Sequence, residues 1–317
     1  MSDTYFEILR PGINSSIQDK GRNHLYHIGI TISGAMDQRI FTLSNALVNN
    51  DLNEGVIEFA HQGPLLRLKN GSINFTVTGN IKFNILRKNS KIEEGKCFQN
   101  YFLENDDQID IITSINSVFG YLAVEGGFQI EKVWNSYSTN IKAKVGPNNG
   151  EKFSVNEKIY IKKPKVEKFL EKKLDYTILL EKNIRVIKGT NFNYFSEEAK
   201  KKFFQEKYLV TNQSDRMGMR LEGAKLENIA NTNIKSEGLV KGVVQVPADG
   251  NPIILFSDHG SIGGYPKIAV VITADHDMTA QLTPGSKIKF KEVNLNEAEK
   301  LFKSYFNETK NYIEQIK

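Results

Sequence analysis

The stretch that decides the fold expected for this chain is residues 236–277, SEGLVKGVVQVPADGNPIILFSDHGSIGGYPKIAVVITADHD. Apolar and largely β-branched runs at 243–246, 253–256 and 268–272 alternate with glycine, proline and aspartate. Short runs of this kind, separated by turn-forming residues, are typical of buried strands joined by tight turns. We therefore predict a β-rich domain around this stretch.

Between the last two apolar runs lies the loop 257–267, SDHGSIGGYPK. It carries an acid (Asp258), an imidazole (His259), a phenol (Tyr265) and an amine (Lys267) beside three glycines. Glycine lets the backbone take positive φ and approach a ligand closely, and proline fixes the exit into the next strand. The loop is the first candidate for chemistry. The alternative is a long hairpin connection whose glycines serve the turn alone.

The composition is that of a globular protein. The chain has 317 residues, enough for one large or two ordinary domains, and two is the preferred interpretation. Hydrophobic residues make up 39% and charged residues 25%, and no apolar run has the length of a membrane span, which argues against disordered and membrane classes. The single cysteine, Cys97, excludes an internal disulfide and a cysteine zinc cluster. The first residues lack the features of an export signal, so we expect a cytoplasmic protein.

The charge pattern gives no indication of a nucleic-acid partner. The formal net charge is +5, and the lysines are scattered along the chain. The densest run, residues 158–173 (KIYIKKPKVEKFLEKK), mixes charges of both signs and contains Pro164. No aromatic platform accompanies it, so a solvated linker is the preferred interpretation. We expect neither a nucleic acid nor a membrane as partner, and no metal.

Residues 13–37, INSSIQDKGRNHLYHIGITISGAMD, are dense in polar side chains. Within ten positions they contain Gln18, Asp19, Arg22, His24 and His27. For each histidine a structural role is favoured over a functional one.

A helix is predicted from residue 36, because apolar side chains then recur at helical spacing. These positions are Met36, Ile40, Leu43 and Leu47. Ser33 and Asp37 stand where a cap and a first-turn acid belong. Residues 33–37 therefore either present backbone N–H groups to an anion at a helix N-terminus or form an ordinary cap, which the spacing alone favours.

The remainder of the first half is predicted to be β. Strand-like runs at 56–59, 65–68, 73–78, 109–112 and 119–124 are separated by glycine, proline and asparagine turns. Many short strands with one helix predict a barrel or sandwich with a helical lid. We expect a mainly β protein with a few helices (α+β). Its parts would be an N-terminal barrel-like domain at 1–165 with a lid helix at 36–48, a C-terminal barrel at 166–292, and a terminal helix at 293–317.

The second half repeats this pattern. Strands are predicted at 177–180, 184–188, 208–210 and 288–290, and a helix at 196–204. The tail from Asn294 has the cap and apolar face of an amphipathic helix, which either packs on the barrel or meets a partner.

Arg216 and Arg220 lie four positions apart near Gly218 and Gly223. They either form a fork for a carboxylate or phosphate, or pair with neighbouring acids at the surface.

Familiar catalytic and cofactor motifs are missing from the sequence. There is no glycine-rich dinucleotide or phosphate loop, no serine-hydrolase elbow and no His-Glu-x-x-His pair. The chain also lacks the Met-Lys dipeptide that carries covalently attached biotin. We expect no biotin on this chain and no ATP site of a familiar motif.

Several blocks together resemble the biotin-dependent carboxyltransferase-like family, which includes the 5-oxoprolinase C subunits, allophanate hydrolase subunit 2 homologues, urea carboxylase and KipA. The early blocks are Arg10-Pro11-Gly12, Ile17-Gln18-Asp19, Gly21-Arg22, Ser33-Gly34-Ala35-Met36-Asp37, Asn45 and Glu58. The later blocks are Ser214-Asp215-Arg216-Met217-Gly218, Arg220-Leu221-Glu222-Gly223, Ser236-Glu237-Gly238, Gln245-Val246-Pro247, Gly250, Pro252 and Gly263-Gly264-Tyr265-Pro266-Lys267-Ile268. The likeness extends in order to about Phe290.

The resemblance implies two cyclophilin-like β-barrel domains. It also implies work beside B-type, and often A-type, partner subunits in opening 5-oxoproline to glutamate with ATP. We expect ATP to be bound with or by one of these partners.

The chain departs from the family pattern in two places. Gly260-Ser261-Ile262 replaces Gln-Thr-Thr, which removes side-chain donors, and Tyr137 replaces an arginine, which removes a cationic fork.

The leading hypothesis is a subunit of an ATP-dependent amidohydrolase of the 5-oxoprolinase type. A lactam carbonyl is a poor electrophile, so the site needs fixed donors to stabilise the charge that develops on its oxygen. The candidate catalytic residues are Asp258, His259, Tyr265 and Lys267, with His259 or Asp258 moving protons. The candidate substrate-binding residues are Arg216, Arg220, Gly263, Gly264, Gln18, Asp19, Arg22, Ser33 and Asp37, of which the early group completes the pocket or a subunit interface.

Two alternatives stay open. One is carboxyl transfer from a carboxybiotin on a separate carrier protein, as in urea carboxylase. The other is a non-enzymatic, KipA-like regulator that binds a kinase inhibitor.

Overall fold

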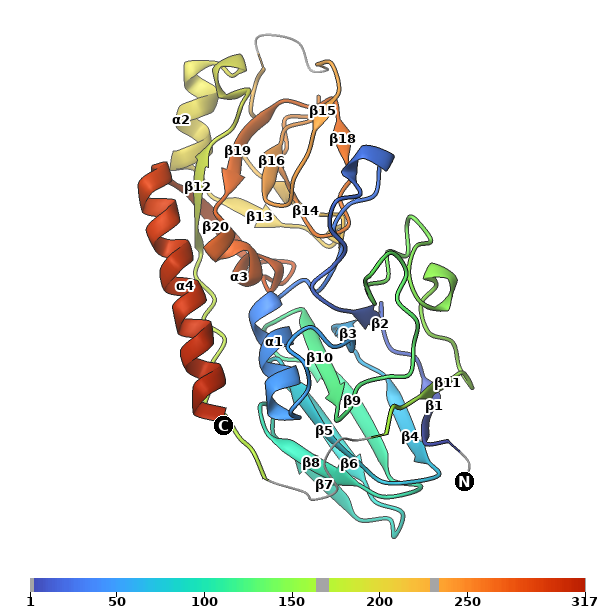
Figure 1. The fold of residues 1–317 in the computed structure, drawn as a ribbon. Coiled ribbons are helices and arrows are strands. Elements are labelled where there is room, and N and C mark those ends of the chain that lie inside the picture. The colour runs from blue at the N-terminus through green and yellow to red at the C-terminus, as the bar shows by residue number, and fades with distance from the viewer. Residues whose placement is uncertain (1–2, 164–170, 229–233, 317) are drawn as a thin grey trace. The chain divides into compact units, whose positions relative to one another are not determined.

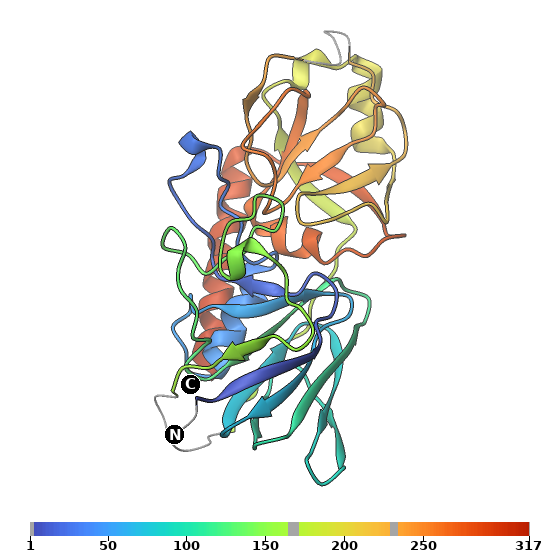
Figure 2. The ribbon, with the colours of Figure 1, turned by 90° about the vertical axis from the view of Figure 1, so that its right-hand side faces the viewer.

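The computed structural model describes residues 3–163, 171–228 and 234–316, and the chain divides into two compact units. Unit 1 contains Met1–Arg22, Ser33–Ile178 and Thr309–Lys317, and unit 2 contains Asn23–Ile32 and Leu179–Glu308. Figure 1 and Figure 2 show the elements of each unit from two directions. The mainly β fold with a few helices that the sequence predicts is confirmed.

Unit 1 is built from two antiparallel sheets. The first has the strand order β11-β1-β4-β9-β6-β7 and the second β2-β3-β10-β5-β8. The strands of the first sheet are β11 (Lys158–Tyr160), β1 (Tyr5–Arg10), β4 (Leu65–Lys69), β9 (Gln108–Ser114), β6 (Ile81–Leu86) and β7 (Ile92–Gly95). Those of the second are β2 (Ser16–Gln18), β3 (Val56–Ala60), β10 (Phe119–Val124), β5 (Ile73–Thr78) and β8 (Asn100–Leu103). The described strands of this unit therefore form two sheets, which fits the barrel or sandwich that the sequence predicts.

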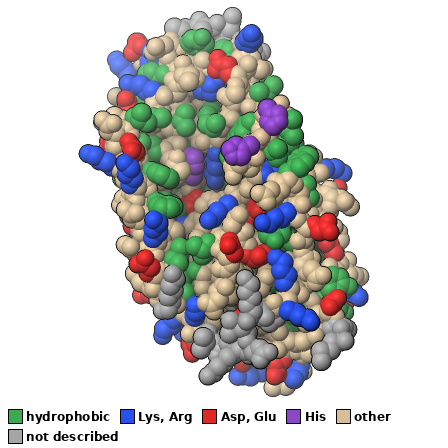
Figure 3. Space-filling view, in the orientation of Figure 1, with side chains coloured by type: hydrophobic (Ala, Val, Ile, Leu, Met, Phe, Trp, Pro, Cys, Tyr) green, Lys and Arg blue, Asp and Glu red, His purple; other side chains and the backbone are tan. Residues whose placement is uncertain are grey.

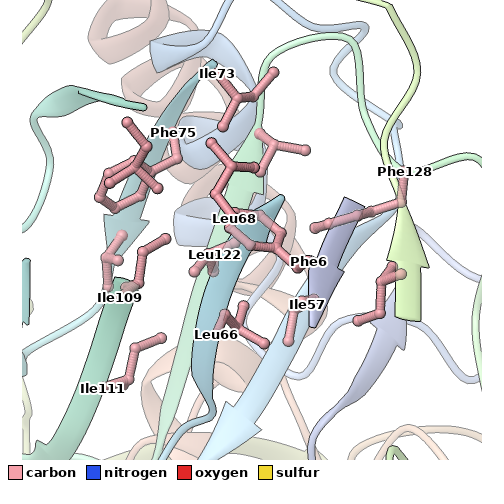
Figure 4. Packing of buried hydrophobic residues seen from close by; sticks show 14 of the residues in the cluster. Phe6, Ile57, Leu66, Leu68, Ile73, Phe75, Ile109, Ile111, Leu122 and Phe128 are labelled. Carbon is pink, nitrogen blue, oxygen red and sulfur yellow. The ribbon is translucent and has the colours of Figure 1, made fainter. Parts of the chain in front are cut away.

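The hydrophobic core of unit 1 takes side chains from both sheets (Figure 4). Leu66 and Leu68 alternate with half-buried neighbours along β4, as expected for a strand with one face in a core. Strand β10 is buried on both faces. Its Leu122 belongs to the core between the sheets, whereas Tyr121 belongs to the cluster around the helix α1 (Gln38–Leu47).

Helix α1 begins at Gln38, close to the predicted start at residue 36. However, Ile40, Phe41, Leu43 and Leu47 are fully buried against β5 and β10. The predicted lid is therefore a core helix, because its apolar stripe covers the outer face of a sheet.

The boundary of unit 1 lies later than the sequence suggested. Leu174, Tyr176 and Ile178 pack into the cluster around α1, so the chain stays with unit 1 as far as Ile178. The predicted boundary at 165 falls in residues 164–170, outside the described residues. Residues 177–180, predicted as a strand, form none, because they have no ladder partner.

Unit 2 contains a closed barrel with the strand order β12-β19-β16-β17-β14-β13-β20. Its strands are β12 (Asn183–Lys188), β19 (Lys267–Val271), β16 (Val243–Gln245), β17 (Ile253–Leu255), β14 (Gly218–Glu222), β13 (Tyr208–Val210) and β20 (Lys287–Glu292). The parallel pair β12–β20 closes it, and its other pairs are antiparallel. The strand-rich stretch 236–277 supplies three of these barrel strands. It also forms a small ribbon of β15 (Glu237–Gly238) and β18 (Ile262–Gly263).

The helices of unit 2 lie outside its barrel. Helix α2 (Glu197–Gln205) packs on β20 through stacked rings of Phe203 and Phe290, whose centroids are 4.3 Å apart. A short helix α3 (His276–Ala280) follows β19. Short 3-10 helices in this unit are η1 (Tyr26–Ile28), η3 (Phe192–Tyr194) and η4 (Thr273–Asp275), and unit 1 contains η2 (Asn148–Gly150).

The predicted terminal helix is confirmed as α4 (Leu295–Ile316), in which the Asn294 Oδ1 accepts the Glu297 backbone N–H at 2.9 Å. Within unit 2 its Ala298, Leu301 and Tyr305 pack against a small buried cluster. Among the described residues, no helix combines the length and the apolar character that crossing a membrane requires.

Candidate functional site

The early candidate residues Gln18, Asp19 and Arg22 are buried in unit 1 and form hydrogen bonds with the loop 136–139. Gln18 Nε2 donates to the carbonyl of Thr139 at 2.8 Å, and its Oε1 accepts from Ser138 Oγ at 2.6 Å. Asp19 accepts from Ser136 Oγ and the Tyr137 N–H, and Arg22 donates to the carbonyl of Ser138. Their hydrogen bonds therefore hold the loop 136–139 against the end of β2.

Tyr137, where the family resemblance has an arginine, has two ammonium groups near its ring. Lys132 Nζ and Lys162 Nζ lie 4.8 Å and 5.0 Å from the ring centroid, within cation–π range. Lys162 also donates to the phenol oxygen at 3.2 Å and pairs with Glu54 at 2.8 Å. Positive charge is therefore still present beside this position.

The loop that contains Ser33 and Asp37 uses its backbone amides inside unit 1. The N–H groups of residues 34–37 all donate to protein acceptors. In order, these acceptors are Ser138 Oγ (2.7 Å), Asp19 O (2.8 Å), Glu58 Oε2 (2.8 Å) and Tyr121 Oη (2.8 Å). Asp37 Oδ1 also accepts the Ile40 N–H at 3.1 Å, which makes Asp37 the N-cap of α1. Of the two alternatives for residues 33–37, an anion site or an ordinary helix cap, this geometry fits the cap.

In unit 2, Asp258 forms a two-point ion pair with Arg216. Arg216 Nε and Nη2 donate to the two carboxylate oxygens at 2.7 Å and 3.1 Å, and both side chains are buried. The Asp258 N–H also donates to the Arg216 carbonyl at 2.9 Å. The carboxylate is therefore held as the counter-ion of a buried guanidinium.

Arg216 and Arg220 do not act as one fork. Arg220 lies in β14 opposite Ile253, whereas Arg216 precedes the strand and is bound to Asp258, beyond the other end of β17. Arg216 stands in the turn between the bridged residues Asp215 and Gly218, so only Arg220 projects from the strand, whereas in a helix two positions four apart would lie together.

His259 is almost completely buried, with 3% of its surface exposed. Its Nδ1 lies 2.6 Å from the Gly260 carbonyl, and its Nε2 lies 3.3 Å from the hydroxyl of Tyr26. Burial lowers the pKa of His259 below its ordinary value. The imidazole is therefore neutral at neutral pH and is able to accept a proton.

Lys267 is buried and its ammonium group bonds to the half-exposed carboxylate of Glu237. This bond lowers the pKa of the Glu237 carboxyl. The Lys267 backbone N–H donates to Asn191 Oδ1 at 3.1 Å. The lysine thus supplies a fixed positive charge at the start of β19.

Gly263 and Gly264 serve close packing, where the sequence suggested positive φ. Neither has a positive φ. A Cβ at Gly263 would lie 2.7 Å from Leu239 Cδ1 and 2.9 Å from Gln245 Nε2, and one at Gly264 would lie 3.0 Å from a backbone oxygen. Gln245 Nε2 in turn donates to the Tyr265 carbonyl at 3.2 Å, so the close packing fixes the tyrosine.

Tyr265 and Arg220 line a cavity of about 420 Å³ in unit 2. The other lining residues are Thr211, Asn212, Gln213, Leu221, Glu222, Pro247, Asp249, Asn251, Pro252 and Ile253. Arg220 is its one cationic lining residue among the described part of the chain. The volume suits a small molecule.

Asn251 also lines this cavity. Its Nδ2 donates to Asp249 at 2.9 Å, while its Oδ1 is buried and has no hydrogen-bond partner among the described residues.

A second hollow, of about 510 Å³, lies in unit 1. It is lined mainly by charged and polar side chains, and its Arg87 is neutralised by Glu93 and Asp107. In the ranges that the structure describes, no group of three His, Cys, Asp or Glu side chains is arranged to hold a metal ion.

The family model described as "Carboxyltransferase domain, subdomain A and B" matches residues 28–292. The chain belongs to this family. It is 31% identical over 312 residues to the C subunit of 5-oxoprolinase from Haemophilus influenzae, covering 98% of this chain and 97% of the relative. It is 29% identical over 294 residues to the C subunit of 5-oxoprolinase from Escherichia coli, covering 92% of each chain.

Among solved structures, the Kluyveromyces lactis urea amidolyase is similar to this family member, with a TM-score of 0.89 and 25% identity. The match covers 98% of this chain but only 20% of the amidolyase. The resemblance to the carboxyltransferase-like family that the sequence motifs indicate is therefore confirmed.

Three polar side chains beside the candidate residues were not predicted from the sequence: Tyr26, Glu237 and Asn251. Glu237 belongs to the family-like block Ser236-Glu237-Gly238, so the sequence did contain a motif that could have marked it as a partner of Lys267. Tyr26 and Asn251 had none, because their surroundings are set by the folded barrel.

Proposed function

We propose that this chain is a subunit of an ATP-dependent amidohydrolase of the 5-oxoprolinase type, which opens 5-oxoproline to L-glutamate together with partner subunits. The observation that carries the proposal is the likeness to two proteins named as the C subunit of 5-oxoprolinase, over nearly the whole length of each. Their names also support partners that resemble the B and A subunits of such an enzyme. ATP is then bound with or by a partner, because this chain has no phosphate loop.

The cavity of unit 2 has groups that match the functional groups of 5-oxoproline. Arg220 provides a guanidinium for the carboxylate. The Tyr265 hydroxyl provides a donor for the lactam carbonyl. We place the substrate there, with the carbonyl at the side of Tyr265.

The remaining candidates receive roles from their contacts. Lys267, with Glu237 as counter-ion, supplies positive charge for the developing oxyanion, and Gly263 and Gly264 position Tyr265. Asp258 orients Arg216 and His259 rather than transferring protons itself. Gln18, Asp19, Arg22, Ser33 and Asp37 shape the loops of unit 1 that we assign to a partner interface.

The test is glutamate release from 5-oxoproline and ATP, with the chain purified together with its neighbouring subunits. We expect Arg220→Ala to raise the KM for 5-oxoproline by roughly 10- to 100-fold, about the effect of one hydrogen bond to a charged group. Arg67→Ala is the matched control, since Arg67 lies on β4 of unit 1 and pairs with Glu7 at 3.6 Å. Absence of glutamate release with all partners present would reject the proposal.

A second candidate function is carboxyl transfer with a separate biotin carrier. It is favoured by the description of the family model and by the likeness to urea amidolyase. A biotin blot of proteins that co-purify with the chain tests it, because this function requires a biotinylated partner. Carboxylation of a biotin carrier in place of glutamate release would select it.

A further inference from the structure

The cavity of unit 2 is lined by charged side chains of both signs. Along β14, Met219 and Leu221 are buried in the core. Arg220 and Glu222 alternate with them, are exposed, and line the cavity. Residues two apart in a strand project from the same face, so this guanidinium and this carboxylate lie along one wall. Asp249, from the loop between β16 and β17, adds a second carboxylate to the lining.

The charges that line this cavity do not pair with one another. Figure 3 shows acidic and basic side chains interspersed over the face that it draws. Neighbouring charges elsewhere in unit 2 form ion pairs, as Lys200 does with Glu197 at 2.7 Å. Within the described part of the chain, by contrast, Arg220, Glu222 and Asp249 take part in no ion pair. Both signs of charge therefore remain available to a ligand.

Asp249 is held in its ionised form. Its Oδ1 and Oδ2 accept the backbone N–H and the Nδ2 of Asn251 at 3.1 Å and 2.9 Å. Desolvation raises the pKa of Asp249, but these hydrogen bonds and the charges of Lys225 and Arg220 outweigh it and lower the pKa below its ordinary value. Each carboxylate oxygen accepts more than one donor, so Asp249 is able to bind a ligand as well.

A ligand with an ammonium and a carboxylate on one carbon complements this lining. The nitrogen of 5-oxoproline is a neutral amide, so it gives the two acids no cation to bind. Opening the lactam breaks its C–N bond. The oxygen of water joins the carbonyl carbon, which becomes a second carboxylate, and both protons of water join the nitrogen, which becomes an ammonium. The product thus gains the group that the acids of the cavity recognise.

We infer that this cavity binds free acidic α-amino acids in preference to the lactam, so that released glutamate competes with 5-oxoproline for it. The identity of the ligand rests on the proposed function. The α-carboxylate binds Arg220, and the new ammonium binds Asp249 and Glu222. The second carboxylate lies at the side of Tyr265, where the lactam carbonyl was. Accumulated glutamate therefore slows its own formation.

The first test is isothermal titration of the full-length chain alone with L-glutamate, 5-oxoproline and glutarate. Glutarate has the two carboxylates of glutamate but no ammonium. We expect glutamate to bind at least about 10-fold more tightly than either of the others, the effect of two hydrogen bonds from an ammonium. Asp249→Asn and Glu222→Gln should each weaken glutamate binding roughly 3- to 10-fold without weakening glutarate binding.

Glu206→Gln is the matched control, because Glu206 is an exposed acid of unit 2 that does not line this cavity. Arg220→Ala should weaken the binding of all three ligands, since each has a carboxylate. Equal affinity for glutamate and glutarate, or no binding of glutamate, would overturn the inference. Acid variants that bind glutamate as tightly as the wild type would also overturn it.

The second test uses the complex with partner subunits and follows the release of ADP from ATP, which added glutamate does not mask. Glutamate should inhibit competitively with 5-oxoproline. Asp249→Asn should raise the inhibition constant of glutamate, relative to the KM for 5-oxoproline, roughly 3- to 10-fold. An active complex without competitive inhibition would overturn the competition. An inactive wild-type complex would reject the proposed function, while the titration would still decide which ligand the cavity binds.

Discussion

The buried pair of Arg216 and Asp258 has a stability consequence that a surface pair does not have. Removing one partner leaves an uncompensated buried charge, which costs about 3–5 kcal/mol. We expect Asp258→Asn to destabilise the protein by about this amount in denaturant unfolding. Lys88→Ala is the control, because Lys88 and Glu104 form a pair in which both side chains are 57% exposed. Its effect should stay below about 1 kcal/mol. Equal effects of the two changes would contradict the buried pairing.

His276 makes stability depend on pH. It is partly buried, and desolvation lowers its pKa from 6.5 to about 4, with further lowering from Lys241 and opposing effects from Asp277 and the Val271 carbonyl. Because its folded pKa is depressed, the unfolded chain binds more protons between these values. Its contribution to stability is therefore fully present above the unfolded pKa and is lost as pH falls to about 4, by about 3 kcal/mol.

Unfolding free energies of the wild type and His276→Gln, measured from about pH 4 to pH 7, test this contribution. The difference between the two proteins should shrink as the pH falls, because only the wild type has to protonate a partly buried ring. His27→Gln is the control at an exposed histidine. Parallel curves for the wild type and His276→Gln would show that this ring does not titrate in the folded protein as stated.

At the scale of elements, a substitution at the start of α1 can distinguish a structural cap from a ligand site. Asp37→Ala should lower stability by about 1 kcal/mol, as loss of an N-cap does. Ser196→Ala is the matched control, since Ser196 Oγ accepts the Ala199 N–H at 3.1 Å at the start of α2. Similar losses in both variants, measured by denaturant unfolding, fit the cap. A further loss of glutamate release in the complex, only with Asp37→Ala, would indicate a role at an interface.

Most strands could be predicted from sequence because their apolar residues alternate or form short buried runs. Strand β6 has this signal in Ile81, Phe83 and Ile85, but it was not assigned. Strands β7 and β8 have little alternation and are defined by their neighbours in the sheets. Residues 177–180 show the opposite case, in which a predicted strand joins no ladder: Ile178 packs on the α1 cluster, whereas Leu179 is exposed. Local pattern thus does not by itself specify which strands pair.

The candidate site follows the same rule. The loop 257–267 was found because it concentrates reactive side chains between two strands. The pairing of Tyr26 with His259 joins positions 233 apart and leaves no periodic signal in the sequence. Arg216 and Arg220 were grouped by their spacing, yet only Arg220 lies in β14, and Arg216 stands in the preceding turn where the ion pair with Asp258 holds it. The composition of the loop located the reactive side chains, whereas the residues that contact them could be identified only in the folded barrel.

At the scale of the whole molecule, the two enzymatic functions differ in the need for a carrier. Lactam opening driven by ATP needs no biotin, whereas carboxyl transfer requires carboxybiotin to reach this chain. Avidin binds biotin and blocks its access to any active site. We therefore expect avidin to leave ATP-dependent glutamate release by the complex unchanged, and depletion of bicarbonate to have no effect.

The control is a biotin-dependent carboxylase assayed with the same avidin, which should lose its activity. Arg220→Ala is informative in the same assay, because Arg220 lines the cavity assigned to 5-oxoproline. It should weaken 5-oxoproline binding equally with and without avidin, since the proposed contact of the guanidinium with the substrate carboxylate does not involve biotin. Inhibition of glutamate release by avidin would instead mean that a biotinylated protein takes part, and the cavity of unit 2 would then have to be reassigned to the carboxyl group that such a carrier delivers.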